Sequence, residues 1–167
     1  MIIHTEDAIL GGAVRVLQPR AGYRFSVDAV QLAAFAFARA PAPRRALDLG
    51  CGTGVVAFIL AHRAPRARLV GVEIQPALAA LARAGADRNG FADRVTILAG
   101  DMQRPHGEIP RGAFDLVVAN PPYHAPGRGR TSPEPSRARA HHEIDVALPD
   151  ARAAASAACA PRGRIAL

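Results

Sequence analysis

Residues 46–54 read ALDLGCGTG, a short apolar strand followed by three alternating glycines. Glycines let the backbone turn sharply and approach a ligand closely, and a helix that begins after the turn points its free N–H groups into the same crevice. A plain strand-to-helix turn needs fewer glycines than this stretch contains. The stretch therefore predicts a ligand site at the carboxyl end of a buried strand, where open α/β sheets bind nucleotides.

The segments that follow this stretch alternate between helix-like and strand-like patterns. Such alternation is typical of an α/β fold, with an open, mainly parallel sheet and helices on both faces. The alternating segments cover residues 45–49, 55–62, 67–72, 76–89, 94–98 and 114–119. A last helix is predicted over residues 149–160, and a fifth strand begins at Arg164. The sequence stops within that strand, so we expect it near an exposed sheet edge, through which two copies could associate.

The first 40 residues have a pattern of their own. Two short strands are predicted within residues 8–18, around a turn at Gly11-Gly12, and a helical pattern begins at Ser26. The apolar positions of that helix are Val27, Val30, Leu32, Ala33 and Phe37. We expect residues 1–40 to form a hairpin and helix packed on one core domain, residues 41–167.

Composition indicates one soluble domain of cytoplasmic type. The chain has 167 residues, half of them apolar, a length that allows a core to be buried without disulfides or a metal. No stretch of about 18 apolar residues offers a membrane span, and the N-terminus MIIHTED lacks the features of a signal peptide. Cys51 and Cys159 are therefore expected to be thiols rather than parts of a disulfide framework.

The excess of basic residues favours a polyanionic partner. The 21 basic residues, all of them arginine, outnumber 14 acidic ones and give a net charge of +7. Residues 121–148 are too long for an ordinary connection, and we interpret them as a substrate loop. Four arginines within residues 124–139 favour contact with RNA phosphates, with a merely solvated loop as the alternative. His141 and His142 lack partners at metal-ligand spacing, so no metal is expected.

Acidic residues stand at the predicted strand ends. Glu73 suits an acceptor for ribose hydroxyls, and Asp101 suits an acceptor for an adenine amino group, with Met102 as a neighbour of the ring. A dinucleotide such as NAD is one alternative, since residues 52–57 fit the pattern G-x-G-x-x-A. Asp48 argues against it, because a carboxylate there suits the cationic sulfonium of S-adenosylmethionine better than a pyrophosphate.

The stretch FDLVVANPPY at residues 114–123 is the most specific feature of the sequence. It predicts a buried strand that ends at Asn120, after which two prolines fix an extended turn without N–H donors. The side-chain oxygen of Asn120 and the carbonyl oxygen of Pro121 can then accept from one exocyclic NH2 group. Those bonds favour the charge that develops when the nitrogen attacks a methyl group. Tyr123 offers a flat face for a planar substrate.

Together the glycine stretch and NPPY resemble the class I amino-methyltransferases, and residues 5–35, with the segment GYRFSVDAV, resemble the tRNA(Val) adenine-N6 methyltransferases. The resemblance implies a Rossmann-like fold, S-adenosylmethionine as cofactor, and methylation of an adenine next to the anticodon. It places Arg24 and Asp28 near the methionine end of the cofactor and makes Asn120, Pro121, Pro122 and Tyr123 the catalytic motif. The cofactor residues that it implies are Arg24, Asp28, Asp48, Gly50, Cys51, Gly52, Gly54, Glu73, Ile74, Asp101, Met102 and Asn120.

This sequence departs from that family at its C-terminus, where the family continues with two further strands. A catalytically inactive fragment that binds cofactor or RNA is therefore a second hypothesis, and an NAD-dependent oxidoreductase is a third. Within the same chemistry, N2 of guanine in ribosomal RNA and the glutamine amide of a release factor remain alternative acceptors.

Overall fold

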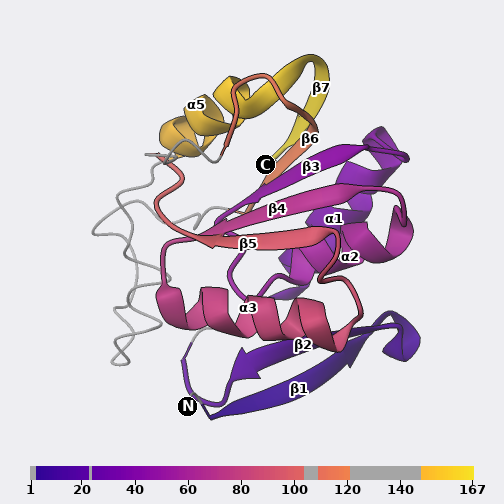
Figure 1. Ribbon diagram of the computed structural model, residues 1–167, viewed down its shortest axis with the longest axis vertical. Helices are drawn as coiled ribbons and strands as arrows, with labels where there is room; N and C mark the ends of the chain where they lie inside the picture. The colour runs from indigo at the N-terminus through magenta and orange to yellow at the C-terminus, as the bar shows by residue number, and fades with distance from the viewer. Residues whose placement is uncertain (1–2, 23, 104–108, 121–147) are drawn as a thin grey trace.

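A five-stranded parallel sheet is the centre of the computed structural model, with strand order β5-β4-β3-β6-β7 (Figure 1). The structure describes residues 3–22, 24–103, 109–120 and 148–167. The strands are β3 (Arg45–Leu49), β4 (Arg68–Glu73), β5 (Val95–Ala99), β6 (Phe114–Ala119) and β7 (Cys159–Ala166). This architecture confirms the predicted α/β fold, and β7 lies at the edge of the sheet as expected.

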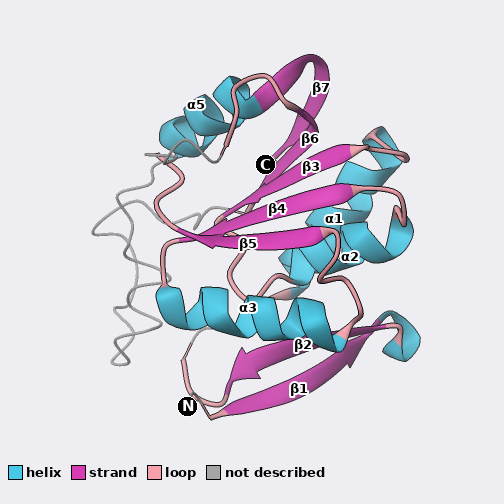
Figure 2. Cartoon of the chain, in the orientation of Figure 1, coloured by secondary structure: helices cyan, strands magenta, loops and turns pink. Residues whose placement is uncertain are grey.

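Helices cover both faces of the sheet (Figure 2). They are α1 (Val27–Arg39), α2 (Val55–Arg63), α3 (Pro76–Arg88) and α5 (Leu148–Ala158). Because side chains alternate along a strand, each strand contributes to two cores. Ala46 and Leu116 pack on the side of α1, α2 and α3, whereas Leu47 and Val117 pack on the side of α5.

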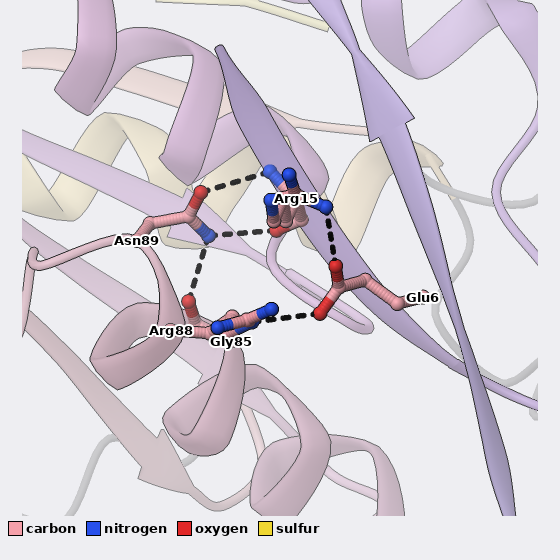
Figure 3. A network of polar contacts seen from close by, with 5 residues as sticks. All are labelled: Glu6, Arg15, Gly85, Arg88 and Asn89. Atoms are coloured by element: carbon pink, nitrogen blue, oxygen red, sulfur yellow. Dashed lines mark hydrogen bonds and ion pairs between the residues drawn. The ribbon is translucent and has the colours of Figure 1, made fainter. Parts of the chain in front are cut away.

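The N-terminal strands β1 (His4–Ile9) and β2 (Val14–Pro19) form a separate antiparallel hairpin, joined by a 3-10 turn at Leu10–Gly12. Figure 3 shows how side chains hold this hairpin against the end of α3. Asn89 pairs with Arg15 of β2 as another strand would: its Oδ1 accepts from the backbone N–H at 2.8 Å, and its Nδ2 donates to the backbone carbonyl at 2.6 Å. Glu6 bonds both Arg15 and Arg88.

The buried face of α1 agrees with the predicted one except at Val27 and at two alanines. Ala33 is buried, and Val30, Leu32 and Phe37 are partly buried against the core, as the pattern predicts. Val27 is 64% exposed, and Ala29 and Ala36 are buried although the pattern does not include them. Small residues face the core because α1 packs closely on α2, and a pattern weighted by large apolar side chains misses Ala29 and Ala36.

The end of the chain also differs in detail. The sequence predicts a last helix that runs to residue 160, but α5 ends at Ala158 and β7 begins directly at Cys159. Pro161 lies inside this strand, which is possible because β7 is an edge strand whose register against β6 shifts between Phe114 and Leu116. Gly163 is needed there, since an added Cβ would lie 2.9 Å from the carbonyl oxygen of Phe114.

Both cysteines are free thiols, as predicted. Cys51 is buried beside Gly71, whereas Cys159 is half-buried. Among the residues that the structure describes, no helix has the length and apolar character needed to cross a bilayer.

Candidate functional site

The carboxyl ends of β3, β4, β5 and β6 gather the predicted site residues that follow these strands at one edge of the sheet, called here the carboxyl edge. Leu49 pairs with Val72 on one side and with Ala119 on the other, and Glu73 pairs with Ala99. The glycine loop that follows Leu49 therefore lies between the end of β4 and the end of β6. The structure brings together residues that are up to 70 positions apart, from Gly50 to Asn120.

The glycine loop has a backbone that glycine alone adopts readily. Gly50, Gly52 and Gly54 have φ values of +71°, +55° and +87°, in the left-handed region. The N–H groups of Gly50 and Cys51 both donate to the carbonyl oxygen of Val72, at 2.8 and 2.9 Å, so the loop is fastened to β4. Gly54 is the N-cap of α2, and a Cβ at this position would lie 2.6 Å from the ring of Phe58.

Asp48 is buried directly beneath this loop. Its carboxylate is 2% exposed and accepts from the backbone N–H of Ala57, in the first turn of α2, at 3.2 Å. The pKa of Asp48 is raised to about 7, chiefly by burial; the N–H of Ala57 opposes this increase, and the charge of Glu73 adds a smaller one. The bond from Ala57 thus connects the end of β3 to the first turn of α2.

Glu73 fixes the shape of the loop from the end of β4. One carboxylate oxygen accepts from the N–H of Gly52 and the other from the N–H of Gln75, both at 2.8 Å. The side chain is only 5% exposed. The acid predicted to serve a ribose is therefore also the group that connects the glycine loop to the turn before α3.

Two apolar side chains lie beside these polar groups. Ile74 directly follows the buried Glu73 and is 51% exposed. Met102 is half-buried and lies over Gly50, since a Cβ on that glycine would be 3.1 Å from the methionine Cε. Asp101 accepts from the N–H of Gln103 at 2.8 Å, which makes it part of the turn after β5.

The thiol of Cys51 is a packing group of the loop. Burial raises the pKa of Cys51 well above the usual thiol value, and the charges of Asp48 and Glu73 raise it further. A buried thiol that stays protonated is unreactive.

Thr53, in the middle of the glycine loop, is a residue that the sequence motifs do not single out. It is 1% exposed, and its hydroxyl has no hydrogen-bond partner within the part of the chain that the structure describes. An unsatisfied buried hydroxyl costs about 1–3 kcal/mol unless a ligand or water pairs with it. Together with the three glycines, this hydroxyl fits a loop shaped to surround a polar ligand. The sequence contains no signal for this role of Thr53, which depends on the burial of its side chain.

The predicted residues near the start of α1 are connected to the hairpin. Arg24 donates to Thr5 Oγ1 at 2.8 Å and pairs with Asp7 at 2.5 Å. Gln18, 2% exposed, also bonds Asp7, and its Oε1 accepts from the N–H of Phe25. Asp28 lies exposed in the first turn of α1, where it accepts from Ser26 Oγ at 3.0 Å.

Asn120 is half-buried and directly follows β6, whose bounds Phe114–Ala119 match the prediction. Pro121, Pro122, Tyr123 and the predicted substrate loop lie outside the described residues. A cavity of about 420 Å³ lies on the α5 side of the sheet and includes Met102, Gln103, Arg111 and Asp150 in its lining. Leu49 also lines it, and Met102 lies over Gly50, so the cavity borders the glycine loop on the α5 side.

Comparisons with known proteins agree with this arrangement. The methyltransferase small domain family matches residues 25–133. A tRNA1(Val) (adenine(37)-N6)-methyltransferase of Porphyromonas gingivalis is 40% identical over 153 residues, covering 86% of this chain and 57% of the relative. A release factor glutamine methyltransferase of Geobacter sulfurreducens is 44% identical over 88 residues, covering 53% of this chain and 29% of the relative.

Among solved structures, a SAM-dependent methyltransferase from Geobacter sulfurreducens in complex with S-adenosyl-L-homocysteine has a TM-score of 0.57 at 21% identity. The match covers 84% of this chain and 47% of the solved chain. That likeness concerns the fold alone. The chain spans 57% of the length of the tRNA methyltransferase that it matches.

Proposed function

Since the chain belongs to the methyltransferase small domain family, we propose that it transfers the methyl group of S-adenosylmethionine to N6 of an adenine in tRNA. One observation carries the proposal: Leu49 and Ala119 are paired residues on adjacent strands, so the glycine loop and Asn120 begin side by side. A cofactor held by the loop would present its reactive end toward the residue best suited to hold an amino group.

The residues of the carboxyl edge fit S-adenosylmethionine. In this proposal Glu73 accepts from the ribose hydroxyls, Asp101 accepts from the adenine amino group, and Ile74 and Met102 pack against the purine ring. The fit is supported by the exposure of Ile74, by the closeness of Met102 to Gly50, and by the unsatisfied hydroxyl of Thr53. Arg24 and Asp28, at the start of α1, are assigned to the methionine end of the cofactor.

Asn120 would act on the acceptor nitrogen. Its side-chain oxygen, with the carbonyl oxygen of Pro121, accepts from the two hydrogens of the NH2 group and holds the lone pair toward the methyl carbon. When bound, the cofactor supplies an electrophilic methyl group on a positively charged sulfur. As the N–C bond forms and the C–S bond breaks, positive charge develops on nitrogen, where both oxygens stabilise it. The nitrogen then loses a proton to solvent. Tyr123 is assigned to stack on the flipped base.

A glutamine amide is the second candidate acceptor. It is favoured by the 44% identity with a release factor glutamine methyltransferase, although that match covers only 53% of this chain. The match with the tRNA methyltransferase extends over 86% of the chain and therefore supports adenine more strongly. Residues 124–139 are proposed to contact the RNA.

The test is methyl transfer from a labelled cofactor to unmodified bulk tRNA, with the product nucleoside identified by mass spectrometry. We expect N6-methyladenosine from the wild-type chain and a decrease in turnover of about 10²- to 10³-fold or more in Asn120→Ala, with cofactor affinity retained. Asn89→Ala is the matched control, because it removes an asparagine that holds the hairpin rather than a reacting group.

Three results would contradict this assignment. Unchanged turnover in Asn120→Ala would remove Asn120 from the chemistry. Methylation of a release-factor peptide but not of tRNA would favour the glutamine amide. Cofactor binding without transfer to either acceptor would identify the chain as a binding module.

A further inference from the structure

Arginines stand in a row at the opposite end of the sheet, where the parallel strands begin. Arg45 of β3 and Arg68 of β4 are paired residues. The N–H of Arg68 donates to the carbonyl oxygen of Arg44 at 2.9 Å, and the N–H of Leu69 donates to that of Arg94 at 2.8 Å. Four arginines, Arg44, Arg45, Arg68 and Arg94, therefore lie at or directly before the starts of three neighbouring strands, along one edge called here the amino edge.

Two helix ends and one turn add further arginines to this edge, because α1 leads into the start of β3 and α2 leads into the start of β4. Arg39 is in the last turn of α1 and Arg63 in the last turn of α2, and Arg66 lies between α2 and β4. All are exposed except Arg94, which is half-buried. The amino-edge arginines are Arg39, Arg44, Arg45, Arg63, Arg66, Arg68 and Arg94.

This row forms no ion pair with an acidic side chain in the part of the chain that the structure describes. The ion pairs of the described residues involve Arg15, Arg24 and Arg88, and none of the amino-edge arginines. Two acids lie at the same edge. The side chain of Asp115 accepts from the backbone N–H groups of Arg44 and Arg45, both at 2.9 Å. The guanidinium of Arg68 donates to the backbone carbonyl oxygen of Asp93 at 3.4 Å.

Phenylalanine rings contact four of the guanidinium groups, and that of Arg94 also donates to the carbonyl oxygen of Ala61 at 2.9 Å. The guanidinium carbons lie 5.0 Å from the ring centroid for Arg39 on Phe35, 5.1 Å for Arg45 on Phe114, 5.7 Å for Arg63 on Phe37 and 4.7 Å for Arg94 on Phe91. A stacked guanidinium keeps its N–H donors at the rim and gives up less side-chain freedom when it binds an anion.

We infer that the amino edge binds the phosphate backbone of RNA as a second contact region, apart from the carboxyl edge. Clustered like charges repel unless an anion lies against them, and planar guanidinium groups suit phosphate. β3 has five residues, so at about 3.3 Å per residue the two edges are roughly 17 Å apart. One folded RNA can reach both. The choice of RNA over another polyanion rests on the proposed function.

Helix dipoles account for some of these arginines, because a cation stabilises a helix C-terminus, as Arg39 and Arg63 do. Arg44, Arg66 and Arg68 are exposed and lie outside helices, so they provide the sharper test. The experiment measures the affinity of the full chain for bulk tRNA by fluorescence anisotropy at several salt concentrations. It compares wild type, R44Q/R66Q/R68Q and R44K/R66K/R68K.

We expect the glutamine variant to bind about tenfold or more weakly and to have a smaller slope of log affinity against log salt, by about 0.7–0.9 for each phosphate that it no longer neutralises. The lysine variant should keep the wild-type slope because it keeps the charge. Photo-cross-linking of the RNA, followed by peptide mass spectrometry, should give cross-linked peptides from residues 39–45 and 62–68. Matching thermal unfolding of the three proteins checks the fold.

An unchanged slope in the glutamine variant would overturn the inference, as would an equal decrease in the lysine variant or an absence of cross-links at those two segments. These readouts do not require turnover. Absence of methyl transfer in a chain whose salt slope still depends on Arg44, Arg66 and Arg68 would therefore refute the proposed reaction alone.

Discussion

The two edges of one parallel sheet are built from the same strands yet differ in charge and backbone. At the carboxyl edge, Asp48 and Glu73 are buried and the loop after β3 has three glycines with positive φ. At the amino edge, seven arginines gather, six of them exposed, and without ion pairs among the described residues. The carboxyl edge is shaped to enclose a small ligand, whereas the amino edge presents charge to a large one.

Each edge also contains an acid that accepts from two backbone N–H groups. Glu73 accepts from the N–H groups of Gly52 and Gln75, and Asp115 accepts from those of Arg44 and Arg45. The bonds are alike, but Glu73 is 5% exposed beside the glycine loop and Asp115 is exposed at the start of β6. Glu73 therefore fixes the shape of the glycine loop, whereas Asp115 fixes the start of β3 against the start of β6.

The largest expected effect is the pH dependence of stability that Asp48 confers. Its pKa in the folded chain, about 7, lies above the ordinary value of 3.8, so the folded state binds the extra proton between these values. The unfolding free energy of the wild type should therefore fall as pH rises from about 4 to about 7, by up to about 4 kcal/mol. Asp48→Asn should lack this decline, as measured by urea unfolding across that range. Parallel curves for the two proteins would contradict it.

The next largest effect is the difference in stability between two glycine substitutions, one in the glycine loop and one before β5. Gly54→Ala should destabilise the chain by about 2–4 kcal/mol, because φ is +87° and the new Cβ would lie 2.6 Å from the buried ring of Phe58. Gly90, before β5, has φ +68°, but nothing lies within 4 Å of an added Cβ, so Gly90→Ala should cost about 1 kcal/mol. Chemical denaturation measures both. Equal destabilisation would show that the clash with Phe58 is unimportant.

The smallest expected effect is the difference in cofactor affinity between substitutions of Glu73 and of Asp115. Glu73→Ala should weaken cofactor binding by about 10- to 100-fold, since it removes charge-assisted bonds that hold the glycine loop. Asp115→Ala should reduce stability but leave cofactor affinity unchanged. Calorimetric titration with S-adenosylhomocysteine gives both values. A similar decrease of affinity in the two variants would mean that Glu73 acts only through general stability.

Much of the carboxyl edge could be predicted from the sequence because its signals are local. A strand followed by alternating glycines and a strand followed by Asn-Pro-Pro each occupy no more than about ten residues, and β3 and β6 have the bounds expected. Parallel pairing then brings their ends together without further information.

Other features depend on contacts that no short pattern contains. The bond between Asn89 and Arg15 joins residues 74 positions apart, and α1 also buries Ala29 and Ala36, which a hydropathy pattern ranks low. The arginine cluster of the amino edge could not be predicted from the sequence for a different reason. Its arginines are scattered one or two at a time, and Arg45, Arg68 and Arg94 become neighbours only when the strands are aligned.

The most direct test of the account is a calorimetric titration of the wild-type chain with S-adenosylhomocysteine and, separately, with NADH. The account predicts one molecule of S-adenosylhomocysteine bound per chain at the carboxyl edge and no measurable binding of NADH. Binding of NADH with no binding of S-adenosylhomocysteine would contradict it.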